Sequence, residues 1–149
     1  MPRAPRNVLP PVGVYHVTAR GVARQEIVRD DQDRRFFRRQ LTLVRRRHRW
    51  LVYAWCLMTN HYHLVVVCDL EQLSRGMHLL NFRHAQAFNG RHDRVGHLFQ
   101  GRFDARVIDG DEHLTTVCEY VFDNPVRAGL CEARTDWRWL GGEVLADLG

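Results

Sequence analysis

Residues 51–68, LVYAWCLMTNHYHLVVVC, form the stretch that most constrains the fold. Two apolar runs flank the polar pair Thr59-Asn60, and this pair suits a tight turn because Asn tolerates a positive φ. The runs predict two strands, residues 51–58 and 61–68. We therefore expect this stretch to form a β-hairpin.

Hydrophobic spacing predicts further elements on both sides of the hairpin. Along the chain they are a strand at 14–20, a helix at 31–48, a helix at 70–89, a strand at 98–108 and a helix at 111–124. Asp30-Asp31 and Asp111 are N-cap candidates for the first and third helices, and Pro125 is expected to end or kink the third. Three apolar residues recur along the first helix and five residues form a stripe on the second: Phe37, Leu41, Val44, and Leu73, Met77, Leu80, His84, Phe88.

The resulting order is strand–helix–strand–strand–helix–strand–helix. An antiparallel hairpin with two crossover helices predicts an α+β fold, a ferredoxin-like βαββαβ sandwich with two helices on one sheet face. The last helix is free to lie on the other face or at a sheet edge. We expect one domain over residues 13–131, a flexible basic arm at 1–12, and a tail over 132–149 that packs on the domain through its tryptophans.

The composition of the 149 residues is that of a soluble globular protein, with 45% hydrophobic and 26% charged residues. The sequence has neither a membrane-spanning apolar run nor a signal peptide, so a cytoplasmic location and no membrane partner are expected. The four cysteines lack the close spacing of a zinc site, which favours free, mostly buried thiols.

Positive charge is concentrated near the N-terminus. Residues 1–49 contain 13 arginines and four acidic residues, whereas residues 107–149 contain three arginines and nine acidic residues. A basic half suits a polyanionic partner. The predicted helix at 31–48 carries seven arginines away from its apolar face, Arg38 and Arg45 among them, and this face is either a DNA-binding surface or a solvated one.

His61 and His63 occupy alternate positions of the hairpin's second strand, so their side chains project from the same sheet face. Two adjacent imidazoles can supply half of the coordination shell of a divalent metal. Tyr62 is expected to face the helices on the other side. An HxH pair alone leaves an incidental, structural role open.

Tyr120 and Asn124 form a second pair, on one face of the last predicted helix. A tyrosine can act as a covalent nucleophile, and an amide oxygen can complete a metal shell with two histidines. From the pattern alone, a core tyrosine and an asparagine placed at a helix end before Pro is the favoured interpretation. The sequence has no GxxxxGK[ST] or GxGxxG phosphate loop, so no nucleotide cofactor is expected.

Four stretches in the same order make the chain similar to a known family. They are residues 15–21 (YHVTARG), 56–65 (CLMTNHYHLV), 96–103 (GHLFQGRF) and 120–130 (YVFDNPVRAGL). In these stretches the chain resembles the REP-associated tyrosine transposases, a branch of the single-tyrosine HUH transposases with an IS200-like transposase domain. The resemblance covers roughly residues 14–131 and implies the HUH endonuclease fold, with a C-terminal catalytic helix.

The resemblance also implies roles for individual residues. His61 and His63 match the metal ligands, Tyr120 matches the nucleophile, and Asn124 falls where related transposases often carry a metal-binding Gln. The implied activity is cleavage and rejoining of single-stranded, often hairpin-forming DNA through a 5′-phosphotyrosine, with Mg²⁺ or Mn²⁺. Thr59 replaces the usual Pro, Tyr62 the usual aliphatic residue, and Asn124 is one methylene shorter than Gln.

Further candidate DNA contacts come from the matched stretches. Arg20, Gln100 and Arg102 are expected to meet DNA, with Arg102 as a phosphate donor that Gly101 allows to approach closely. Arg127 either binds DNA or pairs with the acidic tail. His16 could neighbour the metal site, but a structural role is the expected one.

Two other functions remain open from the sequence. A catalytically silent descendant that only binds single-stranded or hairpin DNA would have nearly the same sequence. A metal-dependent hydrolase that uses water would leave no covalent protein–DNA adduct. Monomer and homodimer, with the tyrosine serving its own or its partner's metal site, are both compatible with the resemblance.

Overall fold

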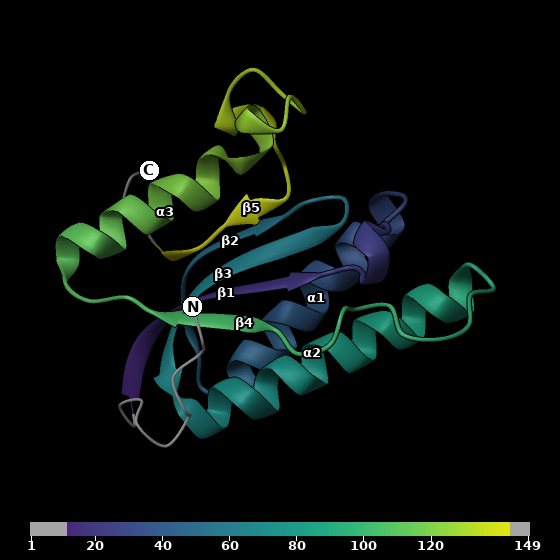
Figure 1. Cartoon of the computed structure of the whole chain (residues 1–149), viewed down its shortest axis with the longest axis horizontal. Helices are drawn as coiled ribbons and strands as arrows, with labels where there is room; N and C mark the ends of the chain where they lie inside the picture. The colour runs from purple at the N-terminus through teal and green to yellow at the C-terminus, as the bar shows by residue number, and fades with distance from the viewer. Residues whose placement is uncertain (1–11, 144–149) are drawn as a thin grey trace.

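The computed structural model describes residues 12–143, and Figure 1 shows a sheet with helices on both of its faces. The strands are β1 (Val12–Arg20), β2 (Leu51–Leu57), β3 (His61–Asp69), β4 (Asp104–Val107) and β5 (Leu140–Gly141). The helices are α1 (Asp31–Arg47), α2 (Leu70–Arg91) and α3 (Asp111–Arg127), with short 3₁₀ helices η2 (Val22–Arg24) and η3 (Arg134–Asp136). The predicted order of elements is thus confirmed, with β5 and the 3₁₀ helices added.

The five strands form one antiparallel sheet in the order β4-β1-β3-β2-β5. The β2–β3 hairpin forms as predicted, and β3 is the central strand. Apart from β5, this strand order is that of a ferredoxin-like sandwich, so the predicted α+β fold is confirmed. The pairing of β1 with β3 sets Thr18 opposite His63 and Arg20 opposite His61, which fixes the neighbours of both histidines.

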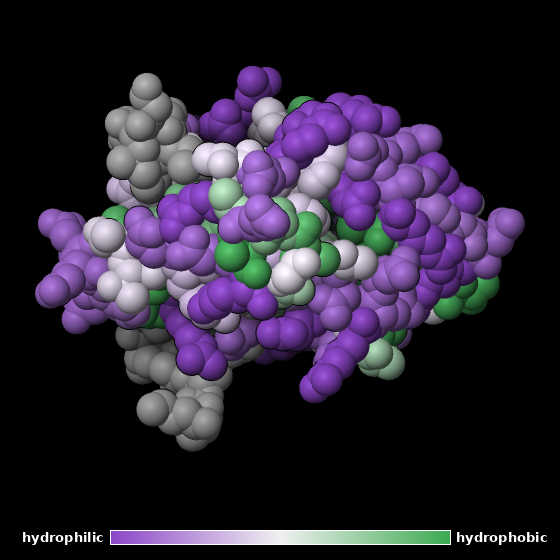
Figure 2. Space-filling view, turned by 90° about the horizontal axis from the view of Figure 1, so that it is seen from above, coloured by the Kyte–Doolittle hydropathy of each residue, from purple (hydrophilic) through white to green (hydrophobic). Residues whose placement is uncertain are grey.

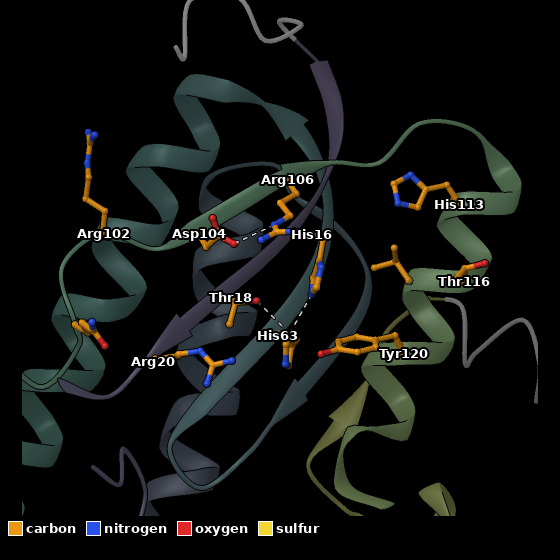
Figure 3. A pocket seen from close by; sticks show the side chains of 12 residues that line it. His16, Thr18, Arg20, His63, Arg102, Asp104, Arg106, His113, Thr116 and Tyr120 are labelled. Atoms are coloured by element: carbon orange, nitrogen blue, oxygen red, sulfur yellow. Dashed lines mark hydrogen bonds and ion pairs between the residues drawn. The ribbon is translucent and has the colours of Figure 1, made fainter. Parts of the chain in front are cut away.

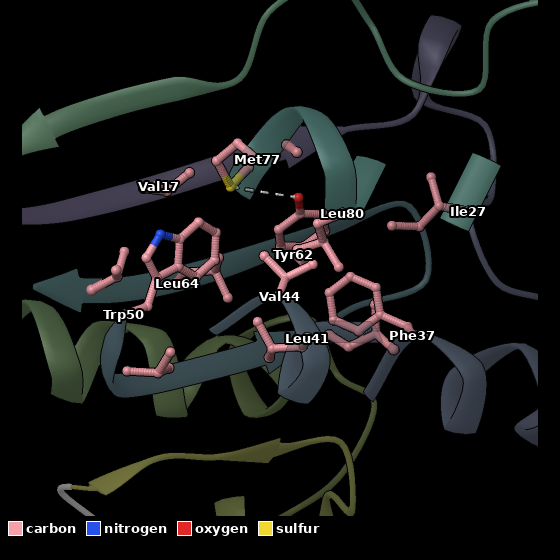
Figure 4. Close-up of a cluster of buried hydrophobic side chains, with 14 of the residues drawn as sticks. Val17, Ile27, Phe37, Leu41, Val44, Trp50, Tyr62, Leu64, Met77 and Leu80 are labelled. Carbon is pink, nitrogen blue, oxygen red and sulfur yellow. Dashed lines mark hydrogen bonds between the residues drawn. The ribbon is translucent and has the colours of Figure 1, made fainter. Parts of the chain in front are cut away.

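The main hydrophobic core lies between the sheet and the helices α1 and α2 (Figure 4). Phe37 and Leu41 on α1 and Met77 on α2 are buried there against the strands. Tyr62 on β3 is fully buried in the same core, with its ring centroid 4.8 Å from that of Phe37. Burial of one such side chain contributes about 1.5–3 kcal/mol, so this layer dominates the stability of the domain. It fixes the orientation of β3 and directs the alternate residues His61 and His63 to the opposite face.

A smaller core lies between that opposite face and α3. It includes Val65 on β3 and Cys118, Val121 and Phe122 on α3, all buried. These contacts place α3 over the face from which the histidines project. The spacing of three and four residues on α3 therefore explains why this helix lies flat on the sheet.

The N-termini of the first two helices begin at aspartate caps. Asp30 accepts a hydrogen bond from the Asp33 backbone N–H at 3.0 Å, and Asp69 accepts one from Gln72 N–H at 2.8 Å. An aspartate cap satisfies a backbone donor that the helix leaves free, and it contributes about 1 kcal/mol. The N-cap predicted for α1 and the apolar faces predicted for α1 and α2 are confirmed, with Phe37, Leu41, Val44 and all five stripe residues of α2 buried.

Three predicted boundaries are corrected. The strand predicted at 98–108 is reduced to β4 at Asp104–Val107, because Gly101 adopts a positive φ of 50° that interrupts the extended backbone. The predicted helix at 111–124 continues to Arg127 with Pro125 inside it, so Pro125 does not end α3. The N-cap of α3 is Gly110 rather than Asp111, which lies in the first turn.

The residue alternation predicted for 98–108 is retained despite the shorter strand. Phe99, Phe103 and Ala105 pack against the main core. Val107, expected on the same apolar face, is 38% exposed at the sheet edge. The polar alternate residues Gln100, Arg102, Asp104 and Arg106 face the side of the sheet that α3 covers.

The C-terminal part of the described chain returns to the sheet. β5 pairs with β2, Trp139 is buried in the main core, and the Trp137 indole N–H donates to the Leu57 carbonyl at 3.1 Å. The arm predicted at 1–12 lies, apart from its last residue, outside the described residues. The predicted free thiols are confirmed, with three buried and Cys131 partly exposed. In Figure 2, hydrophilic residues cover most of the face shown, and within residues 12–143 no helix combines the length and apolar character that crossing a bilayer requires.

Candidate active site

A cavity of about 700 Å³ lies between the β1–β3–β4 side of the sheet and α3 (Figure 3). It is lined by side chains that the alternation of β1, β3 and β4 directs to one face, together with one side of α3. The lining residues are His16, Thr18, Arg20, His63, Gln100, Arg102, Asp104, Arg106, His113, Thr116, Val117 and Tyr120. The lining therefore includes three histidines, a tyrosine and three arginines.

Tyr120 and His63 lie side by side in this cavity, although they come from different elements. Their ring centroids are 5.8 Å apart and the ring planes are nearly perpendicular, at 87°. Figure 3 shows the Tyr120 hydroxyl pointing from α3 toward His63. Tyr120 is 44% exposed, so its hydroxyl is open to a ligand in the cavity. Both side chains belong to the same chain.

His61 and His63 are close enough to serve one ligand, with ring centroids 5.0 Å apart. Burial lowers the pKa of His61 to about 4 and that of His63 to about 3. These values include the repulsion of nearby positive charge, from Arg20 for His61 and from His61, His16, Arg20 and Arg127 for His63. At neutral pH both imidazoles are uncharged and retain a nitrogen lone pair, the state in which histidine binds a metal ion. This donor set fits a divalent cation.

Asn124 lies one turn after Tyr120 on α3, as predicted. Its Nδ2 donates to the Tyr120 backbone carbonyl at 3.4 Å, which leaves the amide oxygen Oδ1 as an acceptor. Among residues 12–143, no hydrogen bond joins Asn124 to either histidine. The structure thus places Asn124 on α3 without bringing it into contact with the histidine pair.

Arg127 stacks on the ring of Tyr120, a position that the sequence could not assign. Its guanidinium carbon lies 4.0 Å from the ring centroid, and Nη2 donates to the Tyr120 carbonyl at 3.3 Å. Among residues 12–143, no ion pair joins Arg127 to the acidic tail that was considered as its partner; Arg134 of that tail instead pairs with Glu119 and Asp123 on α3, both at 2.6 Å. Arg127 therefore packs on the candidate nucleophile and lies near His63.

The other predicted DNA contacts separate into two groups. Arg20, Gln100 and Arg102 line the cavity, and the Gln100 backbone N–H donates to the Arg20 carbonyl at 2.8 Å. Arg38 and Arg45 lie on α1, on the sheet face opposite the cavity, and the guanidinium carbon of Arg38 is 5.2 Å from the Trp139 ring centroid. The structure does not bring these two arginines to the histidine pair.

Several cavity residues were not predicted as functional. His16, expected to be structural, lies with its Nε2 3.0 Å from His63 Nδ1, and Thr18 Oγ1 lies 3.2 Å from the same nitrogen. Arg106 adds a third cationic side chain to the cavity. The sequence did place His16, Thr18 and Arg20 on one face of the strand predicted at 14–20, because they occupy alternate positions. Only the pairing with β3 shows that this face meets His63.

A second group of potential metal ligands, Asp30, Asp33 and His92, joins the start of α1 to the end of α2. Arg91 donates to both carboxylates at 2.6 Å, and His92 Nε2 lies 2.8 Å from Asp33. The hydrogen bond from Arg91 holds the pKa of Asp30 well below its ordinary value. A cation would have to displace the guanidinium that already neutralises these carboxylates, so the group acts as an ion-pair network between helices.

Fold and cavity together describe a ferredoxin-like sheet with a histidine pair under a tyrosine-bearing helix. The sequence matches the family described as "Transposase IS200 like" over residues 12–124. The chain therefore belongs to the IS200-like transposase family. No curated protein sequence matches the chain at a significant level.

Two solved structures have a similar fold. One is described as "Structure of the REP associates tyrosine transposase bound to a REP hairpin"; its TM-score is 0.76 at 17% identity, with 94% of this chain and 82% of that chain covered. The other is a putative transposase from Deinococcus radiodurans, with a TM-score of 0.54 at 13% identity and coverage of 83% and 97%. At these identities the similarity establishes a shared fold.

Proposed function

We propose that the chain cleaves and rejoins single-stranded DNA, with Tyr120 as the nucleophile and a divalent metal ion held by His61 and His63. The observation that carries the proposal is the position of the Tyr120 hydroxyl, which points toward His63 in a cavity lined by arginines (Figure 3). Membership of the IS200-like transposase family supports the same reaction class.

The arginines of the cavity supply the means of binding a phosphodiester. Arg20, Arg102 and Arg106 approach it from β1, the loop before β4, and β4 itself. Guanidinium groups bind phosphate oxygens bidentately and fix the register of a strand without reading its bases. We assign Arg20, Gln100 and Arg102 to DNA binding in this cavity. Arg38 and Arg45 would contact only a DNA segment that reaches the α1 side.

The reaction exchanges one phosphodiester bond for another. The Tyr120 oxygen attacks phosphorus, the bond from phosphorus to the 3′-oxygen breaks, and the 3′-oxygen leaves as a hydroxyl after gaining a proton. The product is a 5′-phosphotyrosine, which conserves the bond energy, so that rejoining requires no nucleotide cofactor. A bound Mg²⁺ or Mn²⁺ would stabilise negative charge on the phosphate oxygens. Arg127 holds the Tyr120 ring in place, and Asn124 offers an additional oxygen ligand.

We further propose that the substrate folds as a hairpin and that one chain supplies the whole active site. A structure of similar fold is described as bound to a REP hairpin, which supports the first point. The second follows from the contact between Tyr120 and His63 within one chain. A homodimer, if formed, would then carry two independent sites.

Incubation of a hairpin-bearing single strand, labelled at its 3′ end so that the fragment held as 5′-phosphotyrosine is visible, with Mg²⁺ or Mn²⁺ tests the proposal. Nicking accompanied by a denaturant-resistant adduct is expected, and Tyr120→Phe should abolish both while retaining DNA binding. Binding without nicking by the wild type would instead identify a silent DNA-binding protein. Nicking without an adduct, retained by Tyr120→Phe, would identify a hydrolase that uses water.

Mixing two inactive variants tests the single-chain active site. A mixture of Tyr120→Phe and His63→Asn should remain inactive, because neither chain has both groups. Recovery of nicking in the mixture would show that the tyrosine serves the partner's metal site.

A further inference from the structure

Both metal-site histidines have one ring nitrogen engaged by the protein, and it is Nδ1 in each case. His61 Nδ1 lies 2.7 Å from Asn60 Oδ1. His63 Nδ1 lies 3.0 Å from His16 Nε2 and 3.2 Å from Thr18 Oγ1. In both rings Nε2 is therefore the nitrogen left for a ligand.

The side-chain amide of Asn60 determines which nitrogen of His61 carries the proton. Asn60 Nδ2 donates to the Arg24 backbone carbonyl at 3.3 Å, and a carbonyl can only accept, so this contact fixes the amide orientation. The Asn60 oxygen then faces His61, and it too can only accept. Nδ1 of His61 must therefore be the protonated nitrogen, and Nε2 retains its lone pair.

The backbone around Asn60 holds this amide in place. The Gly21 N–H donates to the Asn60 carbonyl at 2.8 Å, and the Ile27 N–H donates to the Thr59 carbonyl at 2.9 Å. Between these two anchors, Ala23 and Arg24 adopt positive φ values of 52° and 60°. Such values are uncommon outside glycine and persist where surrounding contacts enforce them. The segment between β1 and α1 is thus bent so that the Arg24 carbonyl meets Asn60.

Two residues of β1, Thr18 and His16, contact Nδ1 of His63. Thr18 lies directly opposite His63 in the β1–β3 pair, and His16 lies opposite Val65, diagonal to His63. The rings of His16 and His63 are stacked, with centroids 5.2 Å apart and planes 22° from parallel. These contacts direct Nδ1 toward β1 and fix the ring orientation.

We propose that Asn60 is a positioning residue of the metal site, which holds His61 in the Nδ1-protonated tautomer, while Thr18 and His16 hold the Nδ1 edge of His63. The inference rests on the proposed function for the identity of the ligand at Nε2. Outer hydrogen bonds of this kind fix the tautomer of a metal-binding histidine, and their loss typically weakens metal affinity 10- to 100-fold.

The tautomer can be measured in the metal-free protein, independently of any activity. Long-range ¹H–¹⁵N correlation spectra at neutral pH should show His61 protonated at Nδ1 in the wild type. Asn60→Ala should give a mixture of tautomers or the Nε2-protonated form, whereas Asn60→Asp keeps an acceptor and should restore the wild-type form. Thr59→Ala, at the neighbouring turn position, is the matched control and should not change the spectrum.

Mn²⁺ titration followed by electron paramagnetic resonance provides the second readout. Asn60→Ala should bind about 10- to 100-fold more weakly than the wild type, and Asn60→Asp should recover most of the loss. An Nε2-protonated His61 in the wild type, or an Asn60→Ala variant with unchanged tautomer and affinity, would overturn the inference. A wild type with the expected tautomer but no Mn²⁺ binding would overturn the metal site of the proposed function instead, and with it the assigned purpose of Asn60.

Discussion

The ring of Tyr120 on α3 lies edge-on to the ring of His63 on β3, with 5.8 Å between their centroids. Cys118, Val121 and Phe122 anchor α3 on the sheet, whereas Tyr120 is not part of this buried cluster and stays 44% exposed. His63 is only 3% exposed, so the contact joins a buried imidazole to an accessible phenol.

The location of the metal site is tested by comparing two variants. His63→Asn removes one of the paired imidazoles, and Mn²⁺ affinity should fall on the order of 100-fold or more, since a ligand is lost rather than an outer contact. Asp33→Asn, in the ion-pair network, should leave Mn²⁺ affinity unchanged. It should lower the free energy of unfolding by about 2 kcal/mol, because Arg91 and His92 lose a buried charged acceptor.

Isothermal titration with Mn²⁺ and urea unfolding would separate the two roles. The reverse pattern, with Mn²⁺ binding lost in Asp33→Asn and retained in His63→Asn, would move the metal to the network between α1 and α2.

Arg127 is predicted to act on the position of the nucleophile. Arg127→Gln removes the group that stacks on Tyr120, so the rate of adduct formation at saturating DNA should fall roughly 10- to 100-fold. Arg127→Lys retains the charge without the planar stack, so its rate of adduct formation should lie between those of the wild type and Arg127→Gln. Single-turnover kinetics measure the effect.

Arg138→Gln is the matched control, because it also removes one positive charge but at a side chain that is paired with Asp31 on α1. Its rate should equal that of the wild type. If Arg127→Gln weakened DNA binding while the rate at saturation stayed unchanged, Arg127 would be a phosphate contact only.

The buried histidines predict a loss of stability in mild acid. The folded-state pKa is about 4 for His61 and about 3 for His63, whereas an unfolded histidine titrates near about 6.5. Between these values the unfolded chain binds more protons, so the free energy of unfolding decreases as the pH falls from about 6.5 through the folded-state values. Urea midpoints of the metal-free protein should therefore be lower at about pH 5 than at about pH 7.

A double variant, His61→Asn with His63→Asn, isolates this contribution. Its urea midpoint should fall less over the same pH interval than that of the wild type. An equal fall in both proteins would assign the acid sensitivity to other groups, such as the buried His84, whose pKa burial also lowers.

The hairpin and the facing of its histidines could be predicted from sequence because both depend on local spacing. Residues i and i+2 of a strand share a face whatever the rest of the fold does. The neighbours of His63 could not be predicted in the same way. They depend on the register that sets Thr18 opposite His63, and this register is fixed by packing of the whole sheet.

Two features that depend on contacts between distant parts of the chain, strand β5 and the sheet face that α1 covers, could not be predicted from the sequence either. The two residues of β5 are too few to show a period, and their pairing comes from the free edge of β2. The arginine face of α1 was visible as a pattern, but a helical pattern does not show which side of the sheet the helix will cover. Arg38 consequently contacts Trp139, far along the chain, on the side away from the cavity.

The identity of the attacking residue is tested most directly by mass spectrometry of the covalent complex. Trypsin releases residues 107–127 as one peptide, in which Tyr120 is the single tyrosine. After reaction with hairpin DNA and nuclease trimming, this peptide should carry the mass of a 5′-phosphorylated nucleotide on Tyr120. An unmodified peptide from protein that has nicked its substrate, with a free 5′-phosphate on the DNA, would contradict the account.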